Sequence, residues 1–145
     1  MKITFKGDYA LKVLLDLSIN QGKPQSSDEI ARRQDIPVKF LEQILLQLKK
    51  GGFVKSFRGQ KGGYLLSKDP KNITLGQAIR YIEGPVEPIA CVDHKGTCSY
   101  SSKCVLRDVF RDIGSYIAAK VDSLTFADLK DRQKKKENKY SEYYI

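Results

Sequence analysis

The sequence predicts a mainly α-helical fold with one small β-hairpin. Apolar residues recur at helical spacing over most of the chain, whereas the segment 53–66 has strand-forming residues on both sides of a glycine-rich turn. The segment 105–124 keeps the helical spacing of apolar residues for about five turns. Together these features predict a winged helix-turn-helix followed by a long dimerisation helix.

The first two helices are predicted by hydrophobic spacing and by a capping signal. Leucine, valine and isoleucine recur along 8–19, and the Gln-Gly-Lys-Pro run that follows stops this helix. Ser26 with Glu29 fits a capping box, in which each side chain accepts a hydrogen bond from a free backbone amide at the start of the helix. A short second helix is therefore expected to start here and to end near 34–35.

A third helix is expected from Pro37 to Lys50. Proline suits a first helical position, because its missing amide proton is not needed there. The helix ends in two lysines and two glycines, which place cations beside the negative helix end and then a terminator. Five apolar side chains are expected on its inner side: Phe40, Leu41, Ile44, Leu45 and Leu48. Two helices joined by a tight turn form the helix-turn-helix pattern.

A β-hairpin follows the third helix. Strands are predicted over 53–56 and 64–66, and the glycine-rich turn 58–63 joins them into a wing. These glycines match neither nucleotide-binding fingerprint, which would also require a strand, a turn and then a helix. Beyond the wing we expect a helix over 77–83, and Gly84 with Pro85 ends it.

We expect the chain to divide into four segments. Residues 1–84 would form the winged helix-turn-helix DNA-binding domain, and 85–104 a loop that contains the cysteines. Residues 105–129 would form the dimerisation helix and a closing segment. Residues 130–145 are rich in lysine and polar throughout, which predicts a flexible basic tail.

The charge pattern favours a nucleic-acid partner. The chain carries a formal charge of +9, and ten basic residues but only three acids lie between residues 32 and 71. The charge alone is equally consistent with a solvent-exposed face that binds no partner. The helix-turn-helix pattern favours DNA binding over that alternative. No apolar run is long enough to span a membrane, and the N-terminus lacks the apolar core of a signal peptide. A cytoplasmic location without membrane partners is therefore expected.

Three cysteines, Cys91, Cys98 and Cys104, lie within fourteen residues. Without an export signal they argue against a disulfide framework. Thiolates are the usual ligands of iron–sulfur clusters, and gaps of six and five residues are long enough to wrap one. Two alternatives stay open: a Cys₃His zinc site that includes His94, and burial of the thiols as small hydrophobes.

Four sequence blocks precede the cysteine segment in an order typical of one family: GDYAL at 7–11, PVKFLEQIL at 37–45, RGQKGGYLL at 58–66 and ITLG at 73–76. With them, the chain from residue 1 to roughly 129 resembles the IscR/NsrR/CymR-type winged-helix regulators, the Rrf-two family of bacterial repressors. The resemblance implies a DNA-binding transcription repressor that is a homodimer held by the long helix. It also implies a two-fold symmetric operator and control by a [2Fe–2S] or [4Fe–4S] cluster that senses nitric oxide, redox state or iron supply.

The residues expected to read DNA lie at the start of the third helix and in the wing. A recognition helix presents its first residues to the major groove, and here these are Val38, Lys39, Glu42 and Gln43. Glu42 can accept from a cytosine amino group, Gln43 can pair with adenine, and Lys39 suits a phosphate. The resemblance supports Glu42 and Gln43 as readers and Arg58 as the minor-groove residue of the wing, although Glu42 could also be an ordinary solvent-facing residue. Four lysines are candidates for backbone contacts: Lys49, Lys50, Lys55 and Lys61.

A cluster held by three thiolates needs a fourth ligand. In cluster-assembly regulators of this family a histidine follows the third cysteine by three residues, but Arg107 stands there in this chain and cannot ligate. Nitric-oxide sensors of the family use an aspartate from the first helix of the partner subunit, and Asp8 matches it. We prefer Asp8, then His94, then a small exogenous ligand. Asp8 could instead only stabilise the helix N-terminus. The first cysteine gap is one residue longer than in many members, which makes the geometry of Cys91 differ.

Other functions are weaker alternatives. An enzyme is disfavoured, because no Ser/His/Asp set, nucleotide fingerprint or Cys-x-x-Cys motif is present. The main alternative is a winged-helix regulator with a structural zinc site or no metal, controlled by a partner protein or a small metabolite. A nucleoid or RNA-binding module would show no preference for a palindromic site.

Overall fold

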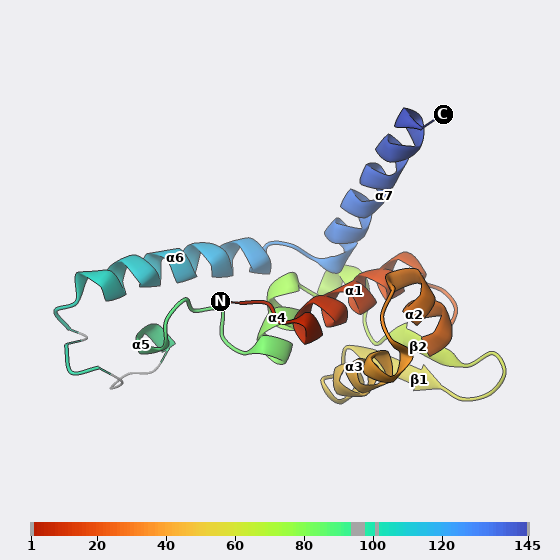
Figure 1. Cartoon of the computed structure of the whole chain (residues 1–145), viewed down its shortest axis with the longest axis horizontal. Helices are drawn as coiled ribbons and strands as arrows, with labels where there is room; N and C mark the ends of the chain where they lie inside the picture. Colours follow the sequence, from red (N-terminus) through yellow and green to blue (C-terminus); the bar gives the residue numbers. More distant parts are fainter. Residues whose placement is uncertain (1, 94–97, 101, 145) are drawn as a thin grey trace.

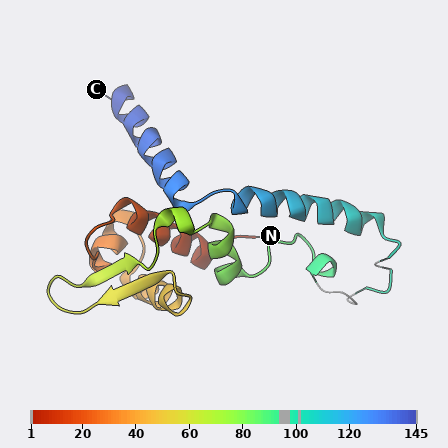
Figure 2. The same ribbon diagram turned by 180° about the vertical axis from the view of Figure 1, so that it is seen from behind.

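The computed structural model describes residues 2–93, 98–100 and 102–144. In chain order its elements are α1 (Phe5–Ile19), α2 (Ser27–Gln34), α3 (Val38–Lys50), β1 (Val54–Phe57), β2 (Gly63–Leu66), the 3-10 turn η1 (Pro70–Asn72), α4 (Leu75–Glu83), α5 (Ala90–Asp93), α6 (Val105–Asp122) and α7 (Phe126–Tyr143). Helices α1 to α4 and the hairpin form one body, from which α6 extends to one side while α7 rises away from the wing (Figure 1). Seen from behind, the cysteine segment and the hairpin lie at opposite ends of the molecule (Figure 2). The predicted fold, mainly helical with one hairpin, is confirmed.

Side-chain caps define where the helices begin. The Ser26–Glu29 capping box is present, with hydrogen bonds of 3.2 and 3.1 Å in the two directions. The Thr4 hydroxyl accepts a bond from the Gly7 amide, so α1 begins three residues earlier than the hydrophobic spacing predicts. Likewise a Thr74–Gln77 box starts α4 at Leu75 rather than at residue 77. A polar cap lies outside the apolar repeat, so hydrophobic spacing alone places helix starts too late.

One apolar core holds α1, α2, α3 and the hairpin together. It includes these buried side chains: Leu14, Leu17, Ile30, Leu41, Ile44, Leu45, Leu48, Val54 and Leu66. The expected inner position of Phe40 is wrong, because 46% of this residue is exposed. Its ring stands edge-on to Tyr9 at the rim of the core, with ring centroids 6.1 Å apart. The inward stripe of α3 is thus narrower than the sequence pattern indicates.

The wing is a two-stranded antiparallel hairpin in which Val54 pairs with Leu66 and Phe57 with Gly63. Gly59 in its turn has φ 106°, a left-handed conformation that favours glycine. The outer edge of β2 carries a further backbone pair, in which the Gln25 amide donates to the Tyr64 carbonyl at 3.0 Å and the Tyr64 amide donates to the Gln25 carbonyl at 2.8 Å. The second strand is therefore held on both sides.

Helix α6 is joined to the rest of the helical body through α4. Ile79, Val86 and Val121 form a second, small core, and Arg80 makes a bidentate pair with Asp122 at 2.6 and 2.9 Å. Beyond this joint, α6 leaves a stripe of apolar side chains exposed: Val105, Leu106, Val109, Ile113 and Tyr116. The long helix is two residues shorter than predicted, and much of its apolar stripe is exposed within the described chain.

The segment after residue 129 is helical, which corrects the expectation of a flexible tail. A Thr125–Asp128 capping box starts α7, and this helix continues to Tyr143. Phe126 is 1% exposed and belongs to the main core, where α7 packs against α1 and η1, so α7 is anchored at its first residue. Its distal part is exposed and polar. Within the described residues, every helix is too short or too polar to cross a bilayer.

Candidate nucleic-acid interface and cysteine segment

The outward face of α3 carries the predicted reading residues. Leu41, Ile44, Leu45 and Leu48 point into the core, which turns the opposite side of the helix to solvent. Four side chains near the start of α3 are exposed: Val38, Lys39, Glu42 and Gln43. No hydrogen bond to another described residue engages the side chains of Glu42 or Gln43. These polar groups are free to meet base edges.

The wing lies beside the C-terminal end of α3. Arg58 is exposed in the turn that follows β1, and the Lys55 ammonium lies 5.6 Å from the centre of the Phe57 ring. The Lys49 ammonium donates to the Ser56 hydroxyl at 2.7 Å, which ties the end of α3 to the first strand. Lys49 therefore has a local role in holding the wing, and its phosphate contact stays a prediction alongside those of Lys50 and Lys61.

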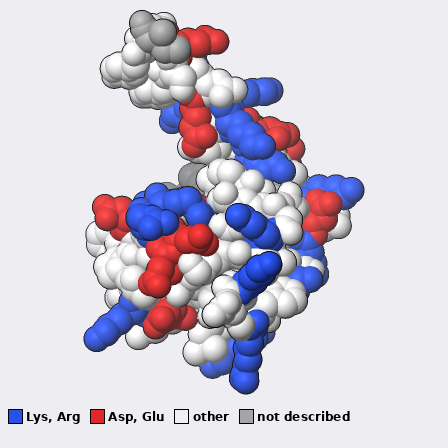
Figure 3. All heavy atoms as spheres, turned by 90° about the vertical axis from the view of Figure 1, so that its right-hand side faces the viewer, with Lys and Arg blue, Asp and Glu red and all other residues white. Residues whose placement is uncertain are grey.

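The wing carries three exposed basic side chains: Lys55, Arg58 and Lys61. Lysine and arginine side chains extend from the lower end of the face shown in Figure 3, where the hairpin lies. One of the ten basic residues counted in the sequence, Arg33, is exposed in part but is paired with the buried Asp16 on α1. Hydrogen bonding to the Asp16 carboxylate, the main cause, raises the pKa of Arg33 above its ordinary value. Charge counts in the sequence could not separate this internal pair from the surface lysines.

The three thiols lie on the segment that connects α4 to α6. Cys91 is the second residue of the short helix α5, which replaces part of the expected loop, and Cys104 is the N-cap residue of α6. Cys98 is exposed, and all three thiols are free. Arg107, which stands where related regulators have histidine, donates from Nε to the Cys91 carbonyl at 3.1 Å. It thereby links α6 to the first cysteine, a contact that the sequence did not predict.

The donors suit a metal or cluster, but they are not gathered. Among residues 2–93, 98–100 and 102–144, no three ligand side chains converge on one point. His94 lies outside the described residues. Asp8 is in the first turn of α1, where it pairs with Lys12 at 2.7 Å and lines a shallow groove with Phe5 and its neighbours. Three unpaired thiols on one short segment fit a thiophilic group by chemistry, and binding would have to draw them together.

Comparison with known proteins identifies the family to which this chain belongs. Residues 3–132 match the family model Rrf2, described as an iron-dependent transcriptional regulator. The chain belongs to the Rrf2 family of transcriptional regulators. It is 38% identical to an rrf2-like HTH-type transcriptional regulator of Rhodobacter capsulatus, over 88% of this chain and 91% of that protein. It is 34% identical to the HTH-type transcriptional regulator IscR of Escherichia coli, over 92% of this chain and 82% of that protein.

Solved structures agree with this assignment. The Rrf2 chain matches CymR, the global cysteine regulator of Bacillus subtilis, with a TM-score of 0.78 and 32% identity, covering 91% of this chain and 98% of that one. It matches IscR of T. potens with a TM-score of 0.71 and 36% identity, covering 91% of this chain and 88% of that one. The family resemblance and the winged-helix fold predicted from the sequence are therefore confirmed. Since these relatives are transcriptional regulators, this Rrf2 protein has a regulatory and not an enzymatic role.

Proposed function

We propose that this Rrf2 regulator represses transcription by binding a two-fold symmetric operator as a homodimer, under the control of an iron–sulfur cluster. The observation that carries the DNA-binding part is the exposed polar face at the start of α3 beside a basic wing. A free helix face of this kind fits the major groove, and an arginine in a wing turn fits an adjacent minor groove.

Each surface residue has a role that follows from its chemistry. Gln43 would pair with adenine and Glu42 would accept from a cytosine amino group, while Val38 offers an apolar contact to a thymine methyl. Arg58 would enter the minor groove. Five lysines would hold the phosphate backbone and carry no sequence information: Lys39, Lys49, Lys50, Lys55 and Lys61.

The exposed stripe on α6 supports a homodimer. Val109 and Ile113, in the middle of α6, are 48% and 43% exposed within the described chain. A contiguous apolar face of this length is unusual on a monomer, and a second copy of the same helix would cover it with matching side chains. Two-fold pairing would set two copies of α3 about one DNA turn apart.

The cysteine segment would hold the cluster. Cys91, Cys98 and Cys104 would supply three thiolates, and the fourth ligand would be Asp8 of the second subunit or His94. When bound, the cluster supplies a site at which nitric oxide, oxidants or iron shortage act. The chain's own part is structural: the cysteines lie between α4 and α6, and Arg107 ties α6 to Cys91. Gathering the thiols would therefore change how α6 joins the DNA-binding body.

A regulator with a structural zinc or no metal is the second candidate. Its version without metal is favoured by the absence of converging ligand side chains within the described ranges. The likeness to CymR, which is named a cysteine regulator, points the same way. In this case a partner protein or a small metabolite would control DNA binding.

DNA binding is tested by selecting duplexes from a random pool with the wild-type chain. A palindromic sequence should be enriched, and Gln43→Ala should lose about 1–3 kcal/mol of discrimination at one position in each half-site. Lys130→Ala, on α7, is a control that should leave this discrimination unchanged. Failure to enrich any sequence would contradict the proposal.

The cluster is tested by the visible spectrum of protein purified without oxygen. Brown protein with absorbance near about 400 nm supports an iron–sulfur cluster, whereas colourless protein with stoichiometric zinc supports the second candidate. Asp8→Ala should alter the spectrum, and Lys12→Ala is the matched control because it breaks the same ion pair but keeps the carboxylate. Unchanged DNA affinity after replacing all three cysteines by serine would refute control by a cluster.

A further inference from the structure

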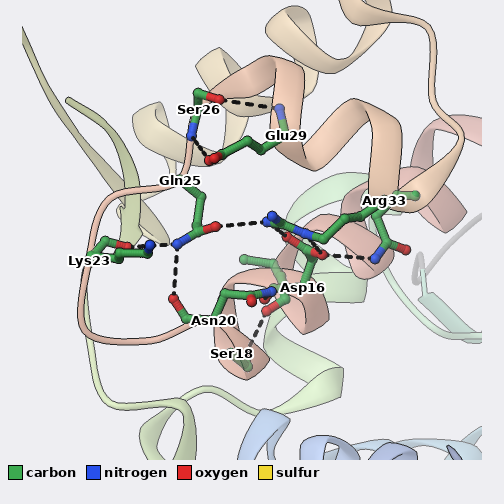
Figure 4. Close-up of polar contacts among 10 residues, drawn as sticks. Asp16, Ser18, Asn20, Lys23, Gln25, Ser26, Glu29 and Arg33 are labelled. Carbon is green, nitrogen blue, oxygen red and sulfur yellow. Dashed lines mark hydrogen bonds and ion pairs between the residues drawn. The ribbon is translucent and has the colours of Figure 1, made fainter. Parts of the chain in front are cut away.

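A partly buried polar network joins α1, α2 and the loop before α2, where the sequence indicated only helix and turn. Arg33 on α2 donates from Nε to Asp16 Oδ1 at 2.9 Å and from Nη2 to Oδ2 at 2.7 Å. Gln34 donates to the same carboxylate at 3.0 Å. Asp16 is 2% exposed, so an ion pair occupies the joint between α1 and α2 (Figure 4).

The network extends to the loop that precedes α2. Arg33 Nη2 also donates to the side-chain oxygen of Gln25 at 3.0 Å, and the Gln25 side-chain nitrogen donates to the Lys23 carbonyl at 3.0 Å (Figure 4). Gln25 is only 3% exposed. Both ends of its amide are thus used, which fixes the side chain and the backbone that carries it.

The backbone of Gln25 in turn holds the wing. Its amide and carbonyl exchange two hydrogen bonds with Tyr64 on β2, at 3.0 and 2.8 Å. The approach is so close that a Cβ on the neighbouring Gly63 would collide with the Gln25 carbonyl. Since β2 pairs with β1 on its other side, the link from Asp16 through Gln25 reaches the strand pair that carries Arg58.

A buried ion pair is weak evidence for stability, because well-packed apolar side chains often replace one without loss. What directed hydrogen bonds supply, and apolar contacts do not, is a fixed geometry. The hairpin is also attached to the body by the apolar packing of Val54 and Leu66 in the core, and by the Lys49–Ser56 hydrogen bond. A directed polar attachment at β2 would fix the angle between α3 and the turn at Arg58.

We propose that Asp16, Arg33 and Gln25 are positioning residues that set the wing relative to α3, so that Arg58 and the α3 readers engage one DNA site together. This inference rests on the proposed function, in which Arg58 binds the minor groove. The three residues would not touch DNA. They would act through the backbone of β2.

A double-mutant cycle tests the inference with the full-length chain and the duplex selected by the wild-type protein. Arg58→Ala should weaken binding of the wild-type chain about 10- to 100-fold. In a chain that already carries Asp16→Leu and Arg33→Met, Arg58→Ala should weaken DNA binding less than about threefold, because the wing is no longer held in place. Thermal melting of the background protein checks that it is folded.

Two further variants make the cycle decisive. Gln25→Met keeps the ion pair and removes its link to the wing, so it should also reduce the effect of Arg58→Ala; it replaces the double variant if that protein does not fold. Arg80→Met removes a similar bidentate pair with Asp122, far from the wing, and should leave the effect at its wild-type size.

The outcomes separate this inference from the proposed function. If Arg58→Ala costs as much in the network variants as in the wild-type chain, the network does not position the wing and the inference is overturned. If Arg58→Ala changes nothing in the wild-type chain, the minor-groove role of Arg58 is itself wrong, and the inference falls with it.

Discussion

Phe126→Ala tests whether α7 seals the DNA-binding body. Phe126 is 1% exposed and packs in the main core, although it begins a helix that the sequence assigns to a separate segment. Truncating a fully buried phenylalanine costs about 3–5 kcal/mol, the transfer of the ring plus the cavity that it leaves. A domain of this size is stable by about 5–15 kcal/mol, so the loss would be a large fraction of the total.

The assay is thermal and urea unfolding followed by circular dichroism. Phe126→Ala should lower the Tm by at least roughly 6 °C. Tyr143→Ala is the matched control, because it removes an aromatic ring from the other end of the same helix, where the residue is 80% exposed. This control should change stability by less than about 0.5 kcal/mol. Equal effects of the two substitutions would show that α7 does not close the core.

Three other substitutions test separate parts of the structure. Val109→Lys on the exposed stripe of α6 should halve the mass measured by light scattering while leaving the helical content unchanged; a dimer that persists would refute pairing through this face. Gly63→Ala should destabilise the wing by about 1–3 kcal/mol, because its Cβ would strike the Gln25 carbonyl, whereas Gly22→Ala, also at positive φ but in open space, should cost less in urea unfolding. Hydrogen bonds from its arginine partner on α4 hold the pKa of Asp122 below its ordinary value of 3.8, so this pair stabilises the fold above that pH and the contribution is lost as pH falls through the lowered pKa. Asp122→Asn should therefore cost about 0.5 kcal/mol at pH 6 and nothing in strong acid, and a difference that grows on acidification would contradict this reasoning.

Local signals in the sequence located most of the elements. Ser26 and Glu29 are three residues apart and bond only to each other's backbone, so a capping box can be recognised without knowing the fold. The glycine-rich turn of the wing is likewise a local feature, because Gly59 needs only its own positive φ. The exposed face of α3 followed from the spacing of its four buried leucine and isoleucine residues.

Errors arose where a residue's environment comes from distant parts of the chain. Phe40 follows the helical pattern of an inner residue, but its ring lies at the rim of the core against Tyr9. Residues 130–143 have a composition typical of disorder, and yet they continue a helix whose first residue is buried. Hydrophobic spacing describes a single helix and cannot report which of its positions another element covers.

In the cysteine segment, too, the sequence predicted the local chemistry but not a contact between two helices. The count and spacing of Cys91, Cys98 and Cys104 predicted thiolate chemistry, because ligand type is a property of the residue itself. The contact between Arg107 and the Cys91 carbonyl joins residues on two helices, and nothing in the sequence near either residue indicates it.

The sequence by itself determined the order of helices α1 to α4, the Ser26–Glu29 cap and the wing, since each depends on neighbours within a few positions. Only the tertiary structure decided that Arg33 is paired with the buried Asp16. It alone joined this network through Gln25 to the wing. Hydrogen bonds and ion pairs between distant residues require atoms within about 3 Å, and folding alone brings those atoms together.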